Sequence, residues 1–204
     1  MMKEPLPEGS INTDAHIKQH QLFGIEMQEK MYTVATTNMI LRGDGKSNLM
    51  LANMFSKTTD NFISNGSKAP ITKVLMNPPY SQGSKGNPDL YEINFIKHAL
   101  DISAQNGKLA VIVPQSTMTG KSKVERAVKQ EILDHHTLDA VVTLNPSTFH
   151  GQRAGVQPVV ALFTANQPHP EQKQVKFINF KDDGWIVKKH LGLQDDGTAS
   201  TKRK

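Results

Sequence analysis

The chain has 204 residues, of which 37% are hydrophobic, and it contains no cysteine. This length is enough to bury one sizeable core in a single domain, and the lack of cysteine excludes a disulfide framework, a thiolate metal site and a cysteine nucleophile. The formal net charge of +5 favours acidic partners without identifying them. We find neither an apolar run of the roughly 18 to 20 residues that span a membrane nor the hydrophobic segment of a signal peptide, so we expect a cytoplasmic protein without a membrane partner.

Several short apolar runs predict buried strands. These runs are LFGIEM at 22–27, VLM at 74–76, KLAVIVP at 108–114, LDAVVTL at 138–144 and PVVALFT at 158–164. Their near-continuous apolar character is typical of a sheet covered on both faces. Helical spacing of apolar residues predicts helices from Tyr91 to Gln105 and from Lys123 onward. Strands that alternate with helices indicate an α/β fold with a doubly wound, mostly parallel sheet.

The end of the chain follows a different pattern. The runs 138–144 and 158–164 are joined by the loop NPSTFHGQRAGVQ without a helix, so we expect them to form an antiparallel hairpin beside the parallel strands. KQVKFINF predicts one more strand, and a polar tail with little capacity to build a core follows it. Residues 56–73 and 81–89 are predicted to be long loops.

The stretch VLMNPPYSQ carries the strongest chemical signal. Ligands of open α/β sheets bind at the carboxyl ends of strands, where Asn77, Pro78, Pro79 and Tyr80 are expected to lie. Two prolines fix φ and remove two backbone donors, so this turn presents carbonyl oxygens and an amide in a stiff frame. Tyr80 adds a flat face for a planar ring. The stretch predicts a clamp for an amino group on a flat substrate, although these four letters alone also fit an ordinary structural turn.

NPPY after a hydrophobic strand resembles the catalytic signature of S-adenosylmethionine-dependent amino-methyltransferases, above all the N6-adenine DNA methyltransferases. Further matches follow in order: LFGIEMQEKMYTVATTNMILRGDGKSN, GKLAVIVPQSTMTG and NPSTFHGQRAGVQPVVALF. Over roughly residues 22–185 the chain resembles the modification subunits of type I restriction-modification systems. This resemblance implies a Rossmann-like methyltransferase fold, with a remnant helix or loop at 1–21, a partial catalytic domain at 22–185 and a polar basic tail at 186–204.

The resemblance also implies how the methyl donor, S-adenosylmethionine, would be held. Glu26 would accept hydrogen bonds from the two ribose hydroxyls of the donor, and Asp44 would accept one from its adenine amino group. The family places a Gly-rich donor loop and a first strand upstream of LFGIEM, where this chain has 21 residues with one glycine. We therefore expect that strand to be missing, which would expose the edges of its neighbours. A fragment, a complementing partner chain and a poorly soluble product all remain possible explanations.

On the side of the target base, the resemblance assigns four positions. Asn77 and the carbonyl of Pro78 would hold the N6 amino group of an adenine that has left the double helix. Tyr80 would stack on this base, and Phe149 would supply a second aromatic wall. Catalysis would rest on alignment and electrostatics, with no metal and no covalent intermediate. Methylation of cytosine C5 uses a cysteine nucleophile, which this chain lacks.

The implied activity is methyl transfer to adenine N6 in DNA by the modification subunit of a restriction-modification system. The implied partners are DNA, a specificity subunit that chooses the sequence, and a restriction subunit. Two alternatives remain open from the residues. One is a protein glutamine or RNA amino-methyltransferase, because an NPPY clamp serves an amide or another base equally well. The other is a non-catalytic remnant that acts as an assembly module.

Overall fold

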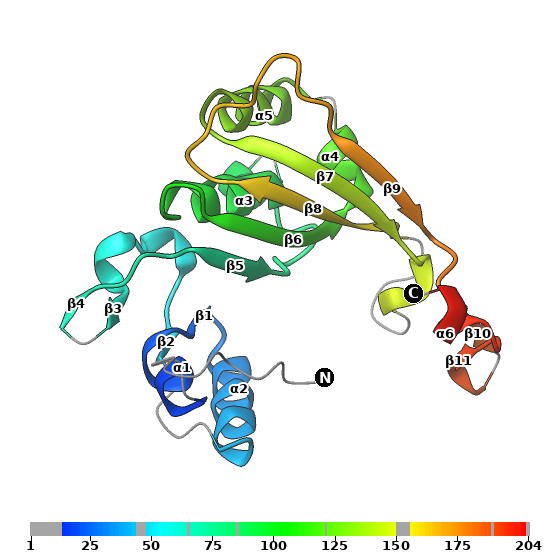
Figure 1. The fold of residues 1–204 in the computed structure, drawn as a ribbon, viewed down its shortest axis with the longest axis horizontal. Coiled ribbons are helices and arrows are strands. Elements are labelled where there is room, and N and C mark those ends of the chain that lie inside the picture. Colours follow the sequence, from blue (N-terminus) through cyan, green and yellow to red (C-terminus); the bar gives the residue numbers. More distant parts are fainter. Residues whose placement is uncertain are drawn as a thin grey trace, which may run out of the picture. The chain divides into compact units, whose positions relative to one another are not determined.

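The computed structural model describes residues 14–43, 48–64, 66–84, 86–120, 122–149, 156–188 and 190–202. Two compact units make up the chain, Met1–Pro70 and Ile71–Lys204. In Figure 1 the first unit is blue to cyan, and the second runs from cyan-green to red. No helix in these described ranges is long and apolar enough to cross a membrane.

The first unit is built on two short parallel strands and one long helix. Its elements are α1 Asp14–His20, β1 Phe23–Glu26, α2 Glu29–Leu41, β2 Asn48–Leu51, the 3₁₀ turns η1 Met54–Ser56 and η2 Thr59–Asn61, β3 Ile63–Ser64 and β4 Ser67–Lys68. Strand β1 pairs with β2 from Phe23 opposite Asn48 to Glu26 opposite Leu51. The buried Phe62 packs edge-on against Phe23, with ring centroids 5.6 Å apart. The predicted strand at LFGIEM is present, whereas the sequence patterns did not predict α2 or β2.

The second unit contains a five-stranded mixed sheet. Its elements are β5 Lys73–Met76, η3 Pro88–Leu90, α3 Glu92–Asp101, β6 Lys108–Pro114, α4 Gln115–Thr119, α5 Lys123–His135, β7 Thr137–Leu144, η4 Pro146–Phe149, β8 Pro158–Thr164, β9 Lys176–Phe180, β10 Trp185–Lys188, β11 Gly192–Asp195 and α6 Ala199–Lys202. The strand order is β5-β6-β8-β7-β9. Strand β8 runs antiparallel to β6 and β7, whereas the β5–β6 and β7–β9 pairs are parallel. The predicted antiparallel pair of 138–144 and 158–164 is confirmed.

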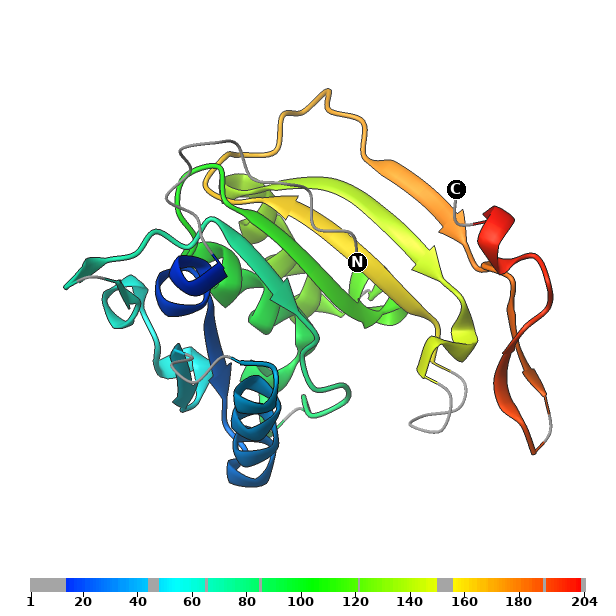
Figure 2. The same ribbon diagram turned by 60° about the horizontal axis from the view of Figure 1, so that its bottom comes forward.

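Helices α3 and α5 cover one face of this sheet in both ribbon views (Figures 1 and 2). The burial of β6 alternates accordingly: Leu109, Val111 and Val113 are fully buried, while Ala110 and Ile112 between them are half-buried. Helix α5 begins with a capping box in which the Ser122 hydroxyl accepts from the Glu125 amide and the Glu125 carboxylate accepts from the Ser122 amide. Helices α3 and α5 correspond to the two helices predicted at 91–105 and from 123.

The last part of the chain is more ordered than a polar tail. Strand β9 lies at the edge of the sheet, and β10 and β11 form an antiparallel hairpin with Trp185 opposite Asp195. Helix α6 follows and buries Ala199. The region expected to lack a core therefore folds back on itself through short-range polar contacts, which a hydrophobic pattern does not reveal.

Candidate active site

The stretch Asn77–Tyr80 forms a turn directly after β5, as the sequence predicts. Pro78 is buried, whereas Asn77 and Pro79 are exposed. The Asn77 side chain makes no hydrogen bond to any residue in the described ranges, and its amide is open to a ligand. Pro78 thus anchors the turn in the protein, and Asn77 offers an unused acceptor and donor at the carboxyl end of a strand.

Tyr80 is held by the neighbouring strand. Its hydroxyl donates to the carbonyl oxygen of Ile112 in β6, at 3.3 Å. Burial, together with the charge of Glu92, raises the pKa of Tyr80 to about 12. The phenol therefore stays neutral at physiological pH, and Tyr80 presents an uncharged ring of fixed position beside Asn77.

The turn after Tyr80 is under backbone constraint. Ser81 has a φ of 57°, a left-handed conformation that is unfavourable for a residue with a side chain. Its amide donates to Oε1 of Glu92, the first residue of α3, at 2.6 Å. Two residues on, a Cβ on Gly83 would lie 2.7 Å from the Cα of Tyr91, so only glycine fits against that backbone. Glu92 and Tyr91 together fasten the loop that follows the clamp to the start of α3.

Phe149 lies beside Tyr80 although the two residues are 69 positions apart in the sequence. The two ring centroids are 6.2 Å apart, and the ring planes are nearly perpendicular at 89°. Phe149 is half-buried at the end of η4, which follows β7. The structure thus brings together the two aromatic residues named from the sequence, in an edge-to-face pair. One ring must turn before both could stack face-on against a single flat base.

The residues expected to hold the donor belong to the other unit. Glu26 ends β1, as predicted, and its Oε1 accepts from the amide of Gln28 at 2.7 Å. This carboxylate is half-buried at a strand end, and a hydroxyl-bearing ligand there would find an anionic acceptor. Asp44 lies outside the described residues. Their roles remain predictions.

Three contributors to this site were not found from the sequence. The Ile112 carbonyl and the Glu92 carboxylate fix Tyr80 and Ser81, and Asn145 precedes the turn that carries Phe149. Asn145 had a detectable signal, because Asn-Pro favours the start of a turn. The Glu92 contact had none, since many helices begin with a glutamate.

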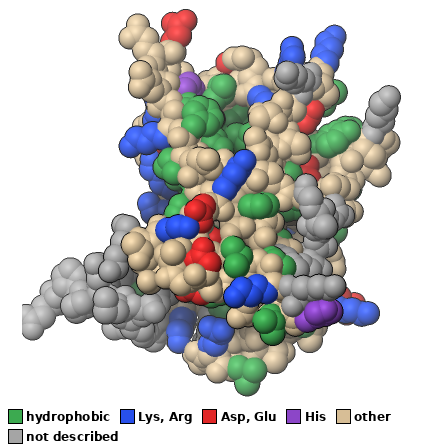
Figure 3. Space-filling model, turned by 90° about the vertical axis from the view of Figure 1, so that its right-hand side faces the viewer, with side chains coloured by type: hydrophobic (Ala, Val, Ile, Leu, Met, Phe, Trp, Pro, Cys, Tyr) green, Lys and Arg blue, Asp and Glu red, His purple; other side chains and the backbone are tan. Residues whose placement is uncertain are grey.

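The charges near the C-terminal end of the molecule are mixed. On the face shown in Figure 3, basic side chains lie among acidic and hydrophobic ones. In the described residues there is no group of three or more His, Cys, Asp or Glu side chains that could hold a metal ion.

Comparison with known proteins gives a consistent picture. The family model described as N-6 DNA Methylase matches residues 7–200. The chain is 54% identical over 188 residues to the Type II restriction enzyme and methyltransferase RM.BcgI of Heyndrickxia coagulans, a match that covers 92% of this chain and 29% of the relative. It is 24% identical over 164 residues to the Type I restriction enzyme EcoEI methylase subunit of Escherichia coli, covering 75% of this chain and 32% of that protein.

A solved structure shares the fold. The crystal structure of the type I restriction-modification system methyltransferase subunit from Streptococcus thermophilus matches with a TM-score of 0.66 at 21% identity, covering 88% of this chain and 40% of that one. The chain spans only 29% to 32% of the length of the two curated relatives.

Proposed function

The chain belongs to the N-6 DNA Methylase family, and from this premise we propose that its clamp serves methyl transfer to the N6 amino group of adenine in DNA. The observation that carries the proposal is the turn after β5: Asn77 is exposed, its side-chain amide has no hydrogen-bond partner among the described residues, and Tyr80 is fixed beside it by the Ile112 carbonyl. The 54% identity to a protein named restriction enzyme and methyltransferase supports the same reaction class.

The proposed chemistry needs little more than positioning. The lone pair of adenine N6 is delocalised into the ring, which makes this nitrogen a weak nucleophile. In the proposal, Asn77 Oδ1 and the Pro78 carbonyl accept hydrogen bonds from the two N6–H groups and draw the amino group toward a pyramidal shape. Tyr80 replaces part of the stacking that the base loses when it leaves the duplex. The protein contribution is then alignment and preorganised acceptors, with no covalent intermediate.

The methyl group would come from S-adenosylmethionine, whose sulfonium charge activates it: as the bond to N6 forms, the bond to sulfur would break, a neutral thioether would leave, and N6 would release one proton to solvent. Within the described residues, Glu26 fits such a ligand, because a carboxylate at the end of a strand suits paired ribose hydroxyls. We assign the second donor contact to Asp44 on the resemblance alone. No step of the proposed reaction requires a metal.

The proposed partners follow from the relatives. The solved S. thermophilus protein is named a subunit of a restriction-modification system, and another matching structure is described as part of a type I complex assembly. We extend this to the present chain and propose that a specificity subunit selects its DNA site and that a restriction subunit joins the complex. Such a system would act on DNA in the cytoplasm.

A chimaera tests the clamp in a complete protein. The chain replaces the matching segment of RM.BcgI, and N6-methyladenine is measured by mass spectrometry in DNA that RM.BcgI methylates, with S-adenosylmethionine as donor. We expect methylation by the chimaera and a loss of about 100-fold or more after Asn77→Ala, because preorganised polar contacts to the reacting group are worth this much. The matched control is Asn166→Ala, which removes another asparagine whose amide donates to the Ser103 carbonyl. Equal rates for the two variants would refute the proposed role of Asn77.

A further inference from the structure

Asn145 occupies a junction that the proposed mechanism does not use. It follows β7 directly and precedes η4, the turn that ends at Phe149. Its side chain is amidic and polar, yet the residue is only 8% exposed. A buried amide is costly unless its donors and acceptor are satisfied, so its partners indicate what holds it in place.

Those partners join two segments that are far apart in the sequence. Asn145 Nδ2 donates to Oδ1 of Asp183 and to the carbonyl of Trp185, both at 2.7 Å. Asn145 Oδ1 accepts from the amide of Ser147 at 2.8 Å, and its backbone carbonyl accepts from the amide of Thr148 at 3.0 Å. Both amide hydrogens and the amide oxygen are therefore used, which fixes the orientation of the side chain. Its two N–H groups bind Asp183 and Trp185 near the end of the chain, and its oxygen stabilises the turn before Phe149.

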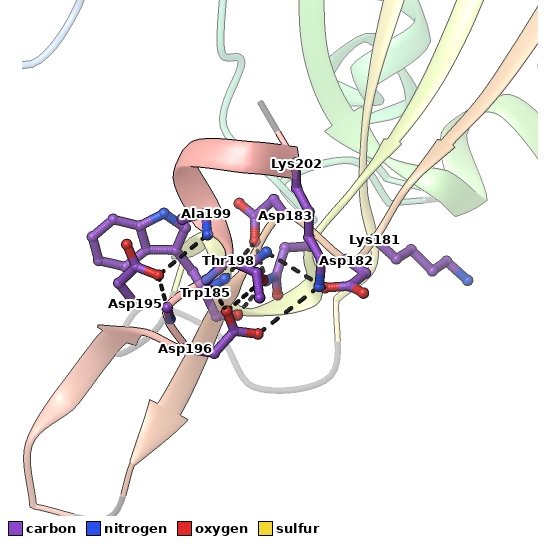
Figure 4. Close-up of polar contacts among 12 residues, drawn as sticks. Lys181, Asp182, Asp183, Trp185, Asp195, Asp196, Thr198, Ala199 and Lys202 are labelled. Atoms are coloured by element: carbon purple, nitrogen blue, oxygen red, sulfur yellow. Dashed lines mark hydrogen bonds and ion pairs between the residues drawn. The ribbon is translucent and has the colours of Figure 1, made fainter. Parts of the chain in front are cut away.

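The segment that receives these bonds is itself well fastened. We call the described residues of Asp182–Lys202 the C-terminal module. In Figure 4 its polar groups converge, with Lys202 against Asp182 at 2.6 Å and Asp195 against the amide of Ala199 at 3.2 Å. A Cβ on Gly184, whose φ is 81°, would lie 2.5 Å from the Cα of Ala199. The module is thus a closed unit rather than a loose end.

We propose that Asn145 is the positioning residue for Phe149, and that through it the C-terminal module forms part of the target-base site. The inference rests on the proposed function, because it gives Phe149 the role of an aromatic wall. Asn145 touches no reacting atom. It fixes the conformation of the turn that holds the Phe149 ring edge-on to Tyr80. Asp183 and Trp185 in turn fix the orientation of the Asn145 side chain.

The test uses a nearly isosteric substitution in the full chain. Asn145→Asp keeps the acceptor for the Ser147 amide but replaces both N–H donors by a carboxylate oxygen, which faces the Asp183 carboxylate and the Trp185 carbonyl. Asn166→Asp is the matched control: Asn166 Nδ2 donates to the Ser103 carbonyl at 2.6 Å, so the chemical change and the loss of a hydrogen bond are the same in kind. The double variant Asn145→Asp with Asp183→Asn restores a donor between the two side chains.

The first readout is the nuclear Overhauser effect between the Tyr80 and Phe149 ring protons in selectively labelled protein. It requires neither DNA nor methyl donor. We expect the cross-peak to fall at least twofold in Asn145→Asp, to persist in Asn166→Asp, and to recover in the double variant. An unchanged cross-peak in a folded Asn145→Asp protein would overturn the inference.

The second readout is binding of a single-stranded oligonucleotide that contains one 2-aminopurine, whose fluorescence is quenched on stacking. We expect Asn145→Asp to weaken binding about tenfold, as one displaced stacking wall would do, and Asn166→Asp to leave it unchanged. Equal losses in both variants would show a general effect on folding and overturn the role in the site. If the unaltered chain fails to quench the probe, the proposed base-binding function is contradicted, while the cross-peak still decides whether Asn145 positions Phe149.

Discussion

The two compact units differ in how they bury apolar side chains. In Ile71–Lys204, residues such as Leu100, Val111 and Ala161 are fully buried. In the described part of Met1–Pro70, Phe62 is the one buried apolar residue, and helix α2 buries none. Large apolar side chains that are exposed in this first unit are Leu22, Met27, Met31, Val34, Ile40, Leu41, Leu51 and Ile63. The sheet therefore carries its own core, whereas the β1–β2 pair and α2 leave large apolar side chains exposed.

The residues with proposed roles fall in both units. The residues that would hold the base, Asn77 and Tyr80, belong to the unit with the core, and Tyr80 is tied to the central part of that unit through Ile112. Glu26, the residue proposed to hold the donor, belongs to the unit with little core. The proposed base-holding residues are therefore preorganised by the packing of their own unit.

Matched truncations of leucine give the largest expected contrast between the units. Leu100 in α3 is 0% exposed, and Leu100→Ala should lower the free energy of unfolding by about 3 kcal/mol through lost burial and a cavity. Leu41 in α2 is 79% exposed, so Leu41→Ala should change it by less than about 0.5 kcal/mol. Urea unfolding followed by circular dichroism measures both values. A large cost at Leu41 would show that its side chain is covered in solution, and the contrast would fail.

Glycine substitutions test whether the C-terminal module shares the stability of the sheet. Gly184 and Gly192 both have positive φ, at 81° and 71°, but an added Cβ would meet the Ala199 backbone only at Gly184. We expect Gly184→Ala to cost about 2 kcal/mol and Gly192→Ala about 1 kcal/mol, the latter from backbone strain alone. Thermal unfolding of the two variants gives the comparison. Equal costs would mean that the packing of Gly184 against α6 adds nothing to the stability of the module.

The sequence predicted the parts of the fold that depend on continuous local patterns. Apolar runs located β1, β5, β6, β7 and β8, and the lack of a helical sequence pattern between residues 144 and 158 predicted that β7 and β8 are antiparallel. Helix α2 was not predicted, because its apolar residues do not lie on one face and none of them is buried. The position of β9 beside β7 depends on pairing between distant residues, which no local pattern encodes.

The same limit applies to the site. The turn at Asn77–Tyr80 could be placed from its prolines and the strand before it. The contacts that hold the site in place could not be predicted, because the Ser81–Glu92 contact spans 11 positions and the Asn145–Asp183 contact spans 38. These contacts arise only when the chain has folded. A single sequence therefore reveals which groups the chemistry needs but not which groups hold them.

Helix capping offers a smaller contrast between the units. The Ser122 hydroxyl accepts from the amide of Glu125 at 3.2 Å at the start of α5, whereas Gln28 precedes α2 without a side-chain cap. Ser122→Ala should lower the free energy of unfolding by about 1 kcal/mol, and Gln28→Ala should leave it nearly unchanged. Chemical denaturation of both variants measures these effects. A loss at Gln28 as large as that at Ser122 would show that α2 depends on its first turn for stability.

The smallest expected effect concerns pH and is confined to the unit with the core. His136 is 2% exposed; its Nδ1 accepts from the Asn166 amide at 3.0 Å, which leaves the ring proton on Nε2 to donate to Asp101 Oδ1 at 3.3 Å. Burial lowers the pKa of His136, and the neighbouring His135 and Lys97 lower it further, although Asp101 opposes them. At neutral pH the folded ring is therefore uncharged, and its contact with Asp101 is a hydrogen bond rather than an ion pair.

Protonation then favours the unfolded chain. Histidine in the unfolded chain has a pKa near 6.5, which is above the pKa of folded His136. Between these two pKa values the unfolded state binds more protons than the folded state. The free energy of unfolding therefore falls as pH falls through this window. From pH 7.5 to 6.0, one such group lowers the free energy of unfolding by at most about 0.8 kcal/mol. Urea midpoints across this range should decline for the unaltered chain and for His135→Gln, an exposed neighbour, and decline less for His136→Gln. A decline of equal slope in all three would place the acid sensitivity elsewhere, and the buried ring would then have no part in it.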